Sequence, residues 1–171
     1  MKAWVLFVAM VLSAAPLLAA PEAGGAQMRI SSPAFGDNGK IPAKYTCYGQ
    51  DASPELAIEG VPPGARSLAL IVDDPDAPGG TFVHWVLYDI PPSTAVIPEN
   101  GSAGTAGPNS AGERGYNSVC PPSGTHRYFF KLYALDAKLS LEPGSAGKQA
   151  VEAAMKGHVL ASAQIMATYS R

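Results

Sequence analysis

Short apolar or alternating segments separated by proline and glycine recur along this chain, and they constrain its fold more than any other feature. Each segment has the length of a β-strand, and turn residues such as Pro78, Gly79 and Gly80 lie between the segments. The sequence therefore predicts a mainly β domain in which the strands on either side of this turn are neighbours. The expected strands are residues 28–31, 56–58, 67–72, 82–90, 128–135 and 161–169.

One helix is expected near the C-terminus, from residue 145 or 147 to residue 156. Val151, Ala154 and Met155 share one face of that helix, and Gly157 follows as a residue that ends helices. Residues 91–125 are rich in glycine, proline, serine and asparagine without any period, which predicts a long irregular excursion rather than a linker. Residues 28–171 are therefore expected to form a single domain.

The first residues have the layout of a secretory signal peptide. Lys2 precedes an apolar run over residues 3–18, and small residues follow this run. We assign residues 1–20 to a signal peptide whose cleavage point lies between residues 19 and 26. No second apolar stretch has the length that crosses a bilayer, so the mature chain is expected to have no transmembrane segment and to be periplasmic or secreted.

Charge and cysteine content narrow the function further. The formal net charge is −2 and the cations are scattered singly, so nucleic acid is not expected as a partner. Two cysteines, Cys47 and Cys120, in a chain bound for an oxidising compartment predict one disulfide. Two buried thiols are the alternative, because a sequence does not show whether the two Cβ atoms approach each other.

Three carboxylates stand where an apolar strand is expected to end. Asp73, Asp74 and Asp76 follow one another closely, and a solvated acidic turn is one interpretation of them. The other interpretation is that an aspartate at the strand end orients an imidazole and favours its charged form. His84 is the candidate partner, because it lies in the next strand, where it and Trp85 are expected to face opposite sides.

A second histidine begins a later strand. His126 and Tyr128 share a face if this segment is extended. Two imidazoles, a phenol and a carboxylate that converge would form a small polar pocket suited to an anion such as phosphate. A structural role in the core is the alternative for either histidine. His158 follows the expected helix and is predicted to cap it.

Five separated motifs resemble the phosphatidylethanolamine-binding protein family, most closely its bacterial Raf-kinase-inhibitor-like branch. The resemblance extends from about residue 30 to residue 171, and the motifs come in the order and approximate spacing of the family. The motifs are residues 73–80 (DDPDAPGG), 84–88 (HWVLY), 120–124 (CPPSG), 126–135 (HRYFFKLYAL) and 155–161 (MKGHVLA).

The resemblance implies an antiparallel β-sandwich with one or two short helices near the C-terminus and a shallow anion pocket. Members of the family bind phosphate-bearing head groups and similar small anions, and some inhibit kinases or proteases. The implied partners are thus a small anionic ligand and a target enzyme, and no cofactor is implied. The implied ligand-binding residues are Asp74, Asp76, His84, Pro121, Pro122, His126 and Tyr128. The pocket wall is expected to contain Trp85, Gly115, Tyr116 and Cys120.

The chain departs from the family pattern at the expected rim of this pocket. Ser118 and Val119 stand where bacterial relatives usually carry a Gly-Pro pair, and Tyr48 stands where an acid is commoner. The rim of the pocket, and the ligand selectivity that it determines, is therefore expected to differ from that of bacterial relatives more than the floor of the pocket does.

Two other functions use the same residues. A hydrolase would use Asp74, His84 and His126 to activate water or the hydroxyl of Ser118 or Ser123. The sequence has no Gly-x-Ser-x-Gly elbow, P-loop or dinucleotide fingerprint, so an enzyme is not expected. Two histidines and a carboxylate can also form part of a metal site, but they lie on separate strands without ligand spacing, and no metal is expected.

Overall fold

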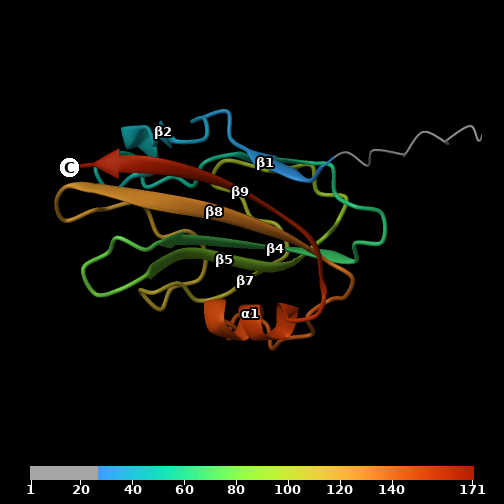
Figure 1. The fold of residues 1–171 in the computed structure, drawn as a ribbon. Coiled ribbons are helices and arrows are strands. Elements are labelled where there is room, and N and C mark those ends of the chain that lie inside the picture. The colour runs from blue at the N-terminus through green and yellow to red at the C-terminus, as the bar shows by residue number, and fades with distance from the viewer. Residues whose placement is uncertain (1–26) are drawn as a thin grey trace, which may run out of the picture.

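The computed structural model describes residues 27–171, which form two packed β-sheets and one α-helix (Figure 1). The signal peptide predicted for residues 1–20 lies outside the described residues. The smaller sheet has the strand order β1-β3-β6, and the larger sheet has the order β2-β9-β8-β4-β5-β7. The elements are β1 (Arg29–Ser31), β2 (Gly39–Lys40), the 3-10 turn η1 (Ala43–Tyr45), β3 (Leu56–Glu59), β4 (Ser67–Asp74), β5 (Phe82–Ile90), β6 (Val96–Ile97), β7 (Thr105–Ala106), β8 (Thr125–Leu135), α1 (Lys148–Met155) and β9 (Val159–Ser170).

Four long strands form the centre of the larger sheet. β4 and β5 pair antiparallel, which confirms the predicted hairpin, and β8 pairs antiparallel with both β4 and β9. The pairing of β2 with β9 is parallel, and it covers only Gly39 with Ala167 and Lys40 with Thr168. The expected antiparallel sandwich is therefore correct for the main strands and differs at this edge.

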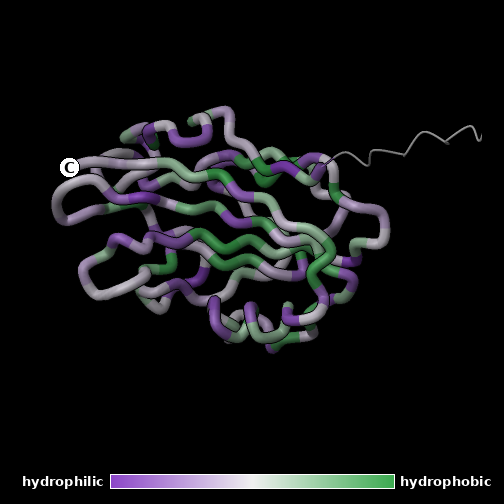
Figure 2. The backbone as a smooth tube through the Cα atoms, viewed as in Figure 1, coloured by the Kyte–Doolittle hydropathy of each residue, from purple (hydrophilic) through white to green (hydrophobic). Residues whose placement is uncertain are grey.

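The core lies between the two sheets, and a second apolar layer lies between the larger sheet and α1. Every residue of β4 is buried, because the smaller sheet covers one of its faces and α1 covers the other. Figure 2 shows the hydrophobic residues concentrated along the central strands. Leu68, Leu70 and Val72 face the smaller sheet, while Ala69 and Ile71 face the helix, so that side chains alternate as a strand requires.

Helix α1 packs on β4 and β5 through the face predicted from the sequence. Val151 and Met155 are buried against the sheet, and Gly157 has a positive φ of 85° just after the helix. The backbone N–H of His158 donates to the carbonyl of Met155 at 2.9 Å, while its ring Nδ1 lies 2.8 Å from a carboxylate oxygen of Asp136. The backbone N–H of His158 therefore caps the helix as predicted for this residue, while its imidazole pairs with Asp136 at the surface.

The excursion over residues 91–125 is irregular for most of its length, but it is tied to the sheets at several points. β6 pairs with β3 and β7 pairs with β5. Near its end, Cys120 is joined by a disulfide to Cys47, with the two Cα atoms 5.4 Å apart. Among the described residues, no helix has both the length and the apolar character needed to cross a membrane.

Candidate functional site

A pocket lies at one end of the larger sheet, where the β4–β5 turn, the segment after residue 116 and the start of β8 meet. These three segments gather at the left edge of the molecule in Figure 1, close to the C-terminal end of β9. The pocket has a volume of about 180 Å³. Its lining residues are Asp74, Ala77, Pro78, Phe82, His84, Asn117, Ser118, Cys120, Pro121, Pro122, His126 and Tyr128.

Asp74 and His126 form a buried pair at the floor of the pocket. Asp74 is the last residue of β4 and His126 is near the start of the neighbouring antiparallel strand β8, so their side chains meet. The Nδ1 atom of His126 lies 2.7 Å from Oδ2 of Asp74. Because a carboxylate accepts, Nδ1 is the donor, and Nε2 is the ring nitrogen left for a ligand. The first-choice partner in the sequence, His84, is not the one Asp74 contacts.

A β-bulge in β5 turns His84 toward the pocket. Val72 pairs with Trp85 and Asp73 pairs with Val83, so β5 has one residue more than β4 at this point, and that residue is His84. Alternation along the strand is interrupted here, and His84 lies on the pocket side, with its ring centroid 5.3 Å from that of Tyr128. The expectation that His84 and Trp85 face opposite sides is wrong, because the extra residue turns His84 toward Tyr128, which belongs with Trp85 to the core between the sheets.

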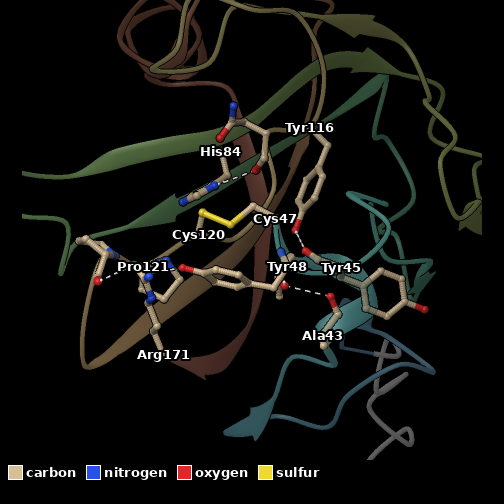
Figure 3. Close-up of a disulfide and its surroundings, with 12 residues drawn as sticks. Ala43, Tyr45, Cys47, Tyr48, His84, Tyr116, Cys120, Pro121 and Arg171 are labelled. Atoms are coloured by element: carbon tan, nitrogen blue, oxygen red, sulfur yellow. Dashed lines mark hydrogen bonds between the residues drawn. A yellow bond between two sulfur atoms is a disulfide. The ribbon is translucent and has the colours of Figure 1, made fainter.

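His84 is clamped to the segment that carries the disulfide. Its Nδ1 lies 2.8 Å from the backbone carbonyl oxygen of Asn117, and the backbone N–H of Asn117 donates to the carbonyl of His84 at 2.8 Å. Figure 3 shows this bond beside the Cys47–Cys120 disulfide, with the second ring nitrogen of His84 directed away from it. That nitrogen, Nε2, is buried and has no hydrogen-bond partner among residues 27–171. Burial lowers the pKa of His84, although the Asn117 carbonyl and the Asp74 carboxylate oppose this shift.

Tyr128 supplies a second buried polar atom without a partner. Its residue is fully buried, and its hydroxyl makes no hydrogen bond within the described residues. Burial raises the pKa of this phenol, with the nearby Asp74 carboxylate adding to the shift, so that the group stays neutral and keeps its O–H. Tyr128 is therefore a donor available to whatever enters the pocket.

Asp76 was implied as a ligand-binding residue, but the structure gives it another partner. Both of its carboxylate oxygens accept from the guanidinium of Arg127, at 2.8 Å from Nε and 2.7 Å from Nη2, and the backbone N–H of Arg127 donates to it at 3.0 Å. Hydrogen bonds from the Arg127 side chain lower the pKa of Asp76 to about 2. Asp76 does not line the pocket and instead ties the β4–β5 turn to β8.

Three of the four expected wall residues lie elsewhere. Trp85, Gly115 and Tyr116 line a separate hollow of about 340 Å³ on another part of the surface. The hydroxyl of Tyr116 donates to the carbonyl of Tyr45 at 3.1 Å, as Figure 3 shows, so it points away from the pocket. Cys120, the fourth, does line the pocket.

Several lining residues were not singled out from the sequence. Phe82 packs on the His84 ring at a centroid distance of 4.8 Å, and Asn117 acts through its backbone carbonyl. Ala77 and Pro78 line the pocket from the motif already noted, and their proximity to the acids was the available signal. No side-chain pattern identifies Asn117, because a backbone carbonyl is present at every residue.

The charges around the pocket are unusual for an anion site. The lining has one acid, Asp74, and two histidines, and among the residues that line it there is no lysine or arginine. Within residues 27–171 no group of three or more histidine, cysteine, aspartate or glutamate side chains has a geometry that could hold a metal ion. Among the residues that line the pocket, only the imidazoles can supply a positive charge to a ligand.

Comparison with known proteins agrees with the fold and with the family resemblance. The profile of the phosphatidylethanolamine-binding protein family matches residues 31–170. A UPF0098 protein of Methanothermobacter thermautotrophicus is 49% identical over 151 residues, which are 84% of this chain and 99% of that protein. A UPF0098 protein of Aquifex aeolicus is 47% identical, covering 87% of this chain and 92% of the relative.

Two crystal structures are similar over nearly their whole length. A phosphatidylethanolamine-binding protein homologue from Chlamydia trachomatis has a TM-score of 0.82 and 41% identity, and the match covers 85% of this chain and 98% of that one. YbcL of Escherichia coli, described as a new member of the mammalian PEBP family, has a TM-score of 0.79 and 27% identity over 85% of this chain and 99% of its own. On this family match and these identities, the chain belongs to the phosphatidylethanolamine-binding protein family.

Proposed function

We propose that this chain binds a small oxyanion of the phosphate class in the pocket formed by Asp74, His84, His126 and Tyr128. The observation that supports this most directly is a pair of buried polar atoms, Nε2 of His84 and the hydroxyl of Tyr128, that have no hydrogen-bond partner in the described part of the chain. A buried polar group left unpaired costs about 1–3 kcal/mol, so folded proteins seldom retain two side by side unless a ligand or water satisfies them. Both belong to residues that line one small hollow.

The positive charge that holds the anion comes from His126. Protonated, this imidazole donates from Nδ1 to Asp74 and from Nε2 into the pocket, while Asp74 balances the charge of the ring. The two carboxylate oxygens of Asp74 already accept hydrogen bonds from His126 Nδ1 and from the backbone N–H of Asp76, which offsets the repulsion between this acid and the anion. Tyr128 adds a neutral donor.

The biological source of the anion is proposed from the family. The name of the family points to the phosphate-bearing head group of a phospholipid, and inhibition of a kinase or protease is a further role that a partner enzyme would reveal. A periplasmic or secreted location is supported by the Cys47–Cys120 disulfide, because such bonds persist in oxidising compartments.

Binding without turnover is proposed over hydrolysis. In the described part of the chain, the hydroxyls of Ser118 and Ser123 make no hydrogen bond to either pocket histidine, and only Ser118 lines the pocket. A nucleophile activated by a base would need such a contact. Incubation with simple phosphoesters should therefore release no product, and a rate abolished by His126→Asn would favour the hydrolase.

The proposal is tested by calorimetric titration with inorganic phosphate at pH 6. The variant His126→Asn keeps an amide donor near Asp74 but loses Nε2 and the positive charge, so phosphate affinity should fall by about tenfold or more. His158→Asn is the matched control, because His158 has the same Nδ1-to-carboxylate contact with Asp136 at 2.8 Å but lies on the surface away from the pocket. Equal losses in the two variants, or no binding by the unmodified chain, would contradict the proposal.

A further inference from the structure

The hydrogen bond between His84 and Asn117 fixes which ring nitrogen of His84 carries a proton. A backbone carbonyl has no hydrogen to give, so Nδ1 must be the donor in the 2.8 Å contact with the oxygen of Asn117. In a neutral imidazole only one nitrogen is protonated. Nε2 of His84 therefore has a lone pair and acts as a hydrogen-bond acceptor.

The surroundings of His84 keep its ring neutral. Phe82 packs on the ring from the same strand, and Tyr128 packs on it from β8. The carboxylates of Asp73 and Asp74 on β4 and the carbonyls of Asn117 and Ser118 favour the charged form, but burial is the largest effect and lowers the pKa. His84 is 4% exposed, so little water reaches it to compensate a charge.

The two histidines of the pocket thus have opposite hydrogen-bonding roles. His126, paired with Asp74, presents a donor when it is protonated, whereas His84 presents an acceptor. An oxyanion without hydrogen would direct its own lone pairs at the lone pair of His84. Such a ligand leaves a buried acceptor unpaired and adds repulsion.

On the basis of the proposed function, we propose that Nε2 of His84 accepts a hydrogen bond from the ligand, so that the pocket selects an oxyanion that carries its own proton. Hydrogen phosphate, dihydrogen phosphate and the monoanion of a phosphomonoester have the necessary P–OH group. Sulfate does not. His84 is then the residue that determines specificity, and His126 is the residue that supplies charge.

The test compares inorganic phosphate with sulfate at pH 7 by calorimetry on the full mature chain. Every phosphate ion has at least one P–OH at this pH, and sulfate, of similar size and shape, has none. Phosphate should bind about ten- to a hundredfold more tightly, the range expected when a buried acceptor loses its only donor. Similar affinities for the two anions would overturn the inference and leave anion binding intact, while absence of binding by both would overturn the proposed function as well.

The variant His84→Gln assigns the selectivity to this side chain. A glutamine amide can present either its N–H or its oxygen by rotation, so the preference for phosphate over sulfate should fall to within about threefold, although both anions still bind. Retention of the full preference would contradict the role of His84.

A spectroscopic measurement on the unmodified protein does not depend on the folding of that variant. Nitrogen NMR of the imidazoles with phosphate bound at pH 7 should show His84 protonated at Nδ1 only. A His84 ring protonated at both nitrogens, or at Nε2 alone, would overturn the inference.

Discussion

Asp73 and Asp74 are consecutive residues of β4, yet they face opposite sides of the sheet and have different kinds of partner. Asp73 lies under α1, where the Nζ atoms of Lys131 and Lys148 approach its carboxylate to 2.8 and 2.5 Å. Asp74 faces the pocket, where its partner is the imidazole of His126. Both acids are almost fully buried, at 1% and 3% exposure, so burial does not distinguish them.

The two sides of β4 differ in whether their buried polar groups all have partners. On the helix side, meaning Asp73 with its two lysines, the buried carboxylate has partners of opposite charge, and this pairing stabilises the fold. The pocket side, meaning Asp74 with the pocket histidines and Tyr128, pairs its acid with an imidazole and, within residues 27–171, has two buried polar atoms without a hydrogen-bond partner. One strand therefore places an acid paired with two lysines next to an acid of the proposed binding site.

Removal of the disulfide is expected to have the largest effect, and it acts on the pocket side. Cys47 and Cys120 are 73 residues apart, and the chain-entropy model assigns a loop of this size roughly 4 kcal/mol. The double variant Cys47→Ser/Cys120→Ser should lower the free energy of unfolding in urea by that order and should also weaken phosphate binding, because Cys120 and Pro121 line the pocket. Hydrogen exchange of the backbone amides of α1 should speed up only as far as the lower global stability predicts, because α1 lies on the other side of the sheet. Unchanged phosphate affinity would show that the pocket does not need this tether.

Breaking the helix side should affect stability alone. The variant Lys131→Met/Lys148→Met leaves the Asp73 carboxylate buried without a partner, which we expect to cost about 3 kcal/mol in the free energy of unfolding. The control is Lys138→Met, since Lys138 is an exposed lysine outside the network. Phosphate affinity should match that of the unmodified chain, and a tenfold loss of affinity would mean that the two sides of β4 are coupled.

Matched amide substitutions test the two acids directly. Asp74→Asn keeps an acceptor for His126 but removes the charge that stabilises its imidazolium, so phosphate affinity at pH 6 should fall by about tenfold, with a stability loss of about 1 kcal/mol. Asp73→Asn should show the reverse pattern, with lower stability and unchanged affinity. Calorimetry measures the phosphate affinity of both variants, and urea unfolding measures their stability. The same pattern in both variants would remove the distinction between the acids.

The sequence predicted the six strands of three or more residues because each is an apolar or alternating segment between turn residues, and it predicted the hairpin because the turn residues are local. It missed β2, β6 and β7, because a strand of two residues is too short to show a pattern. It also indicated the pocket segments, since acids and imidazoles at strand ends are conspicuous. The bulge at His84 could not be predicted, because the register depends on pairing with β4 and not on the sequence of β5 alone.

The partner choices inside the pocket also required coordinates. The sequence favoured His84 as the partner of Asp74, but the partner is His126 on the neighbouring strand β8. His84 instead contacts a backbone carbonyl, a group that every residue has and that no side-chain pattern identifies. Trp85 and Tyr116 are close in sequence to pocket residues but line another hollow, because proximity in sequence does not set the direction of a side chain.

The smallest predicted effect concerns Asp76, where the family resemblance and the geometry differ. Its pKa of about 2 is below the ordinary value of 3.8, so its pairing with Arg127 stabilises the fold above pH 4, and this contribution is lost as the pH falls from 4 toward 2. Asp76 is 28% exposed and Arg127 is 52% exposed, so solvent screening limits the contribution to less than about 1 kcal/mol. Asp76→Asn should therefore lower the free energy of unfolding slightly at pH 5 and not at pH 2.

The same variant decides whether Asp76 also serves the ligand. Because its carboxylate is occupied by Arg127 and does not line the pocket, Asp76→Asn should leave phosphate affinity within about twofold, in contrast to the tenfold loss expected for Asp74→Asn. Calorimetry at pH 6 on the two variants gives this comparison. A loss as large as that of Asp74→Asn would return Asp76 to the ligand-binding set implied by the resemblance, and it would mean that Arg127 releases the carboxylate when the anion binds.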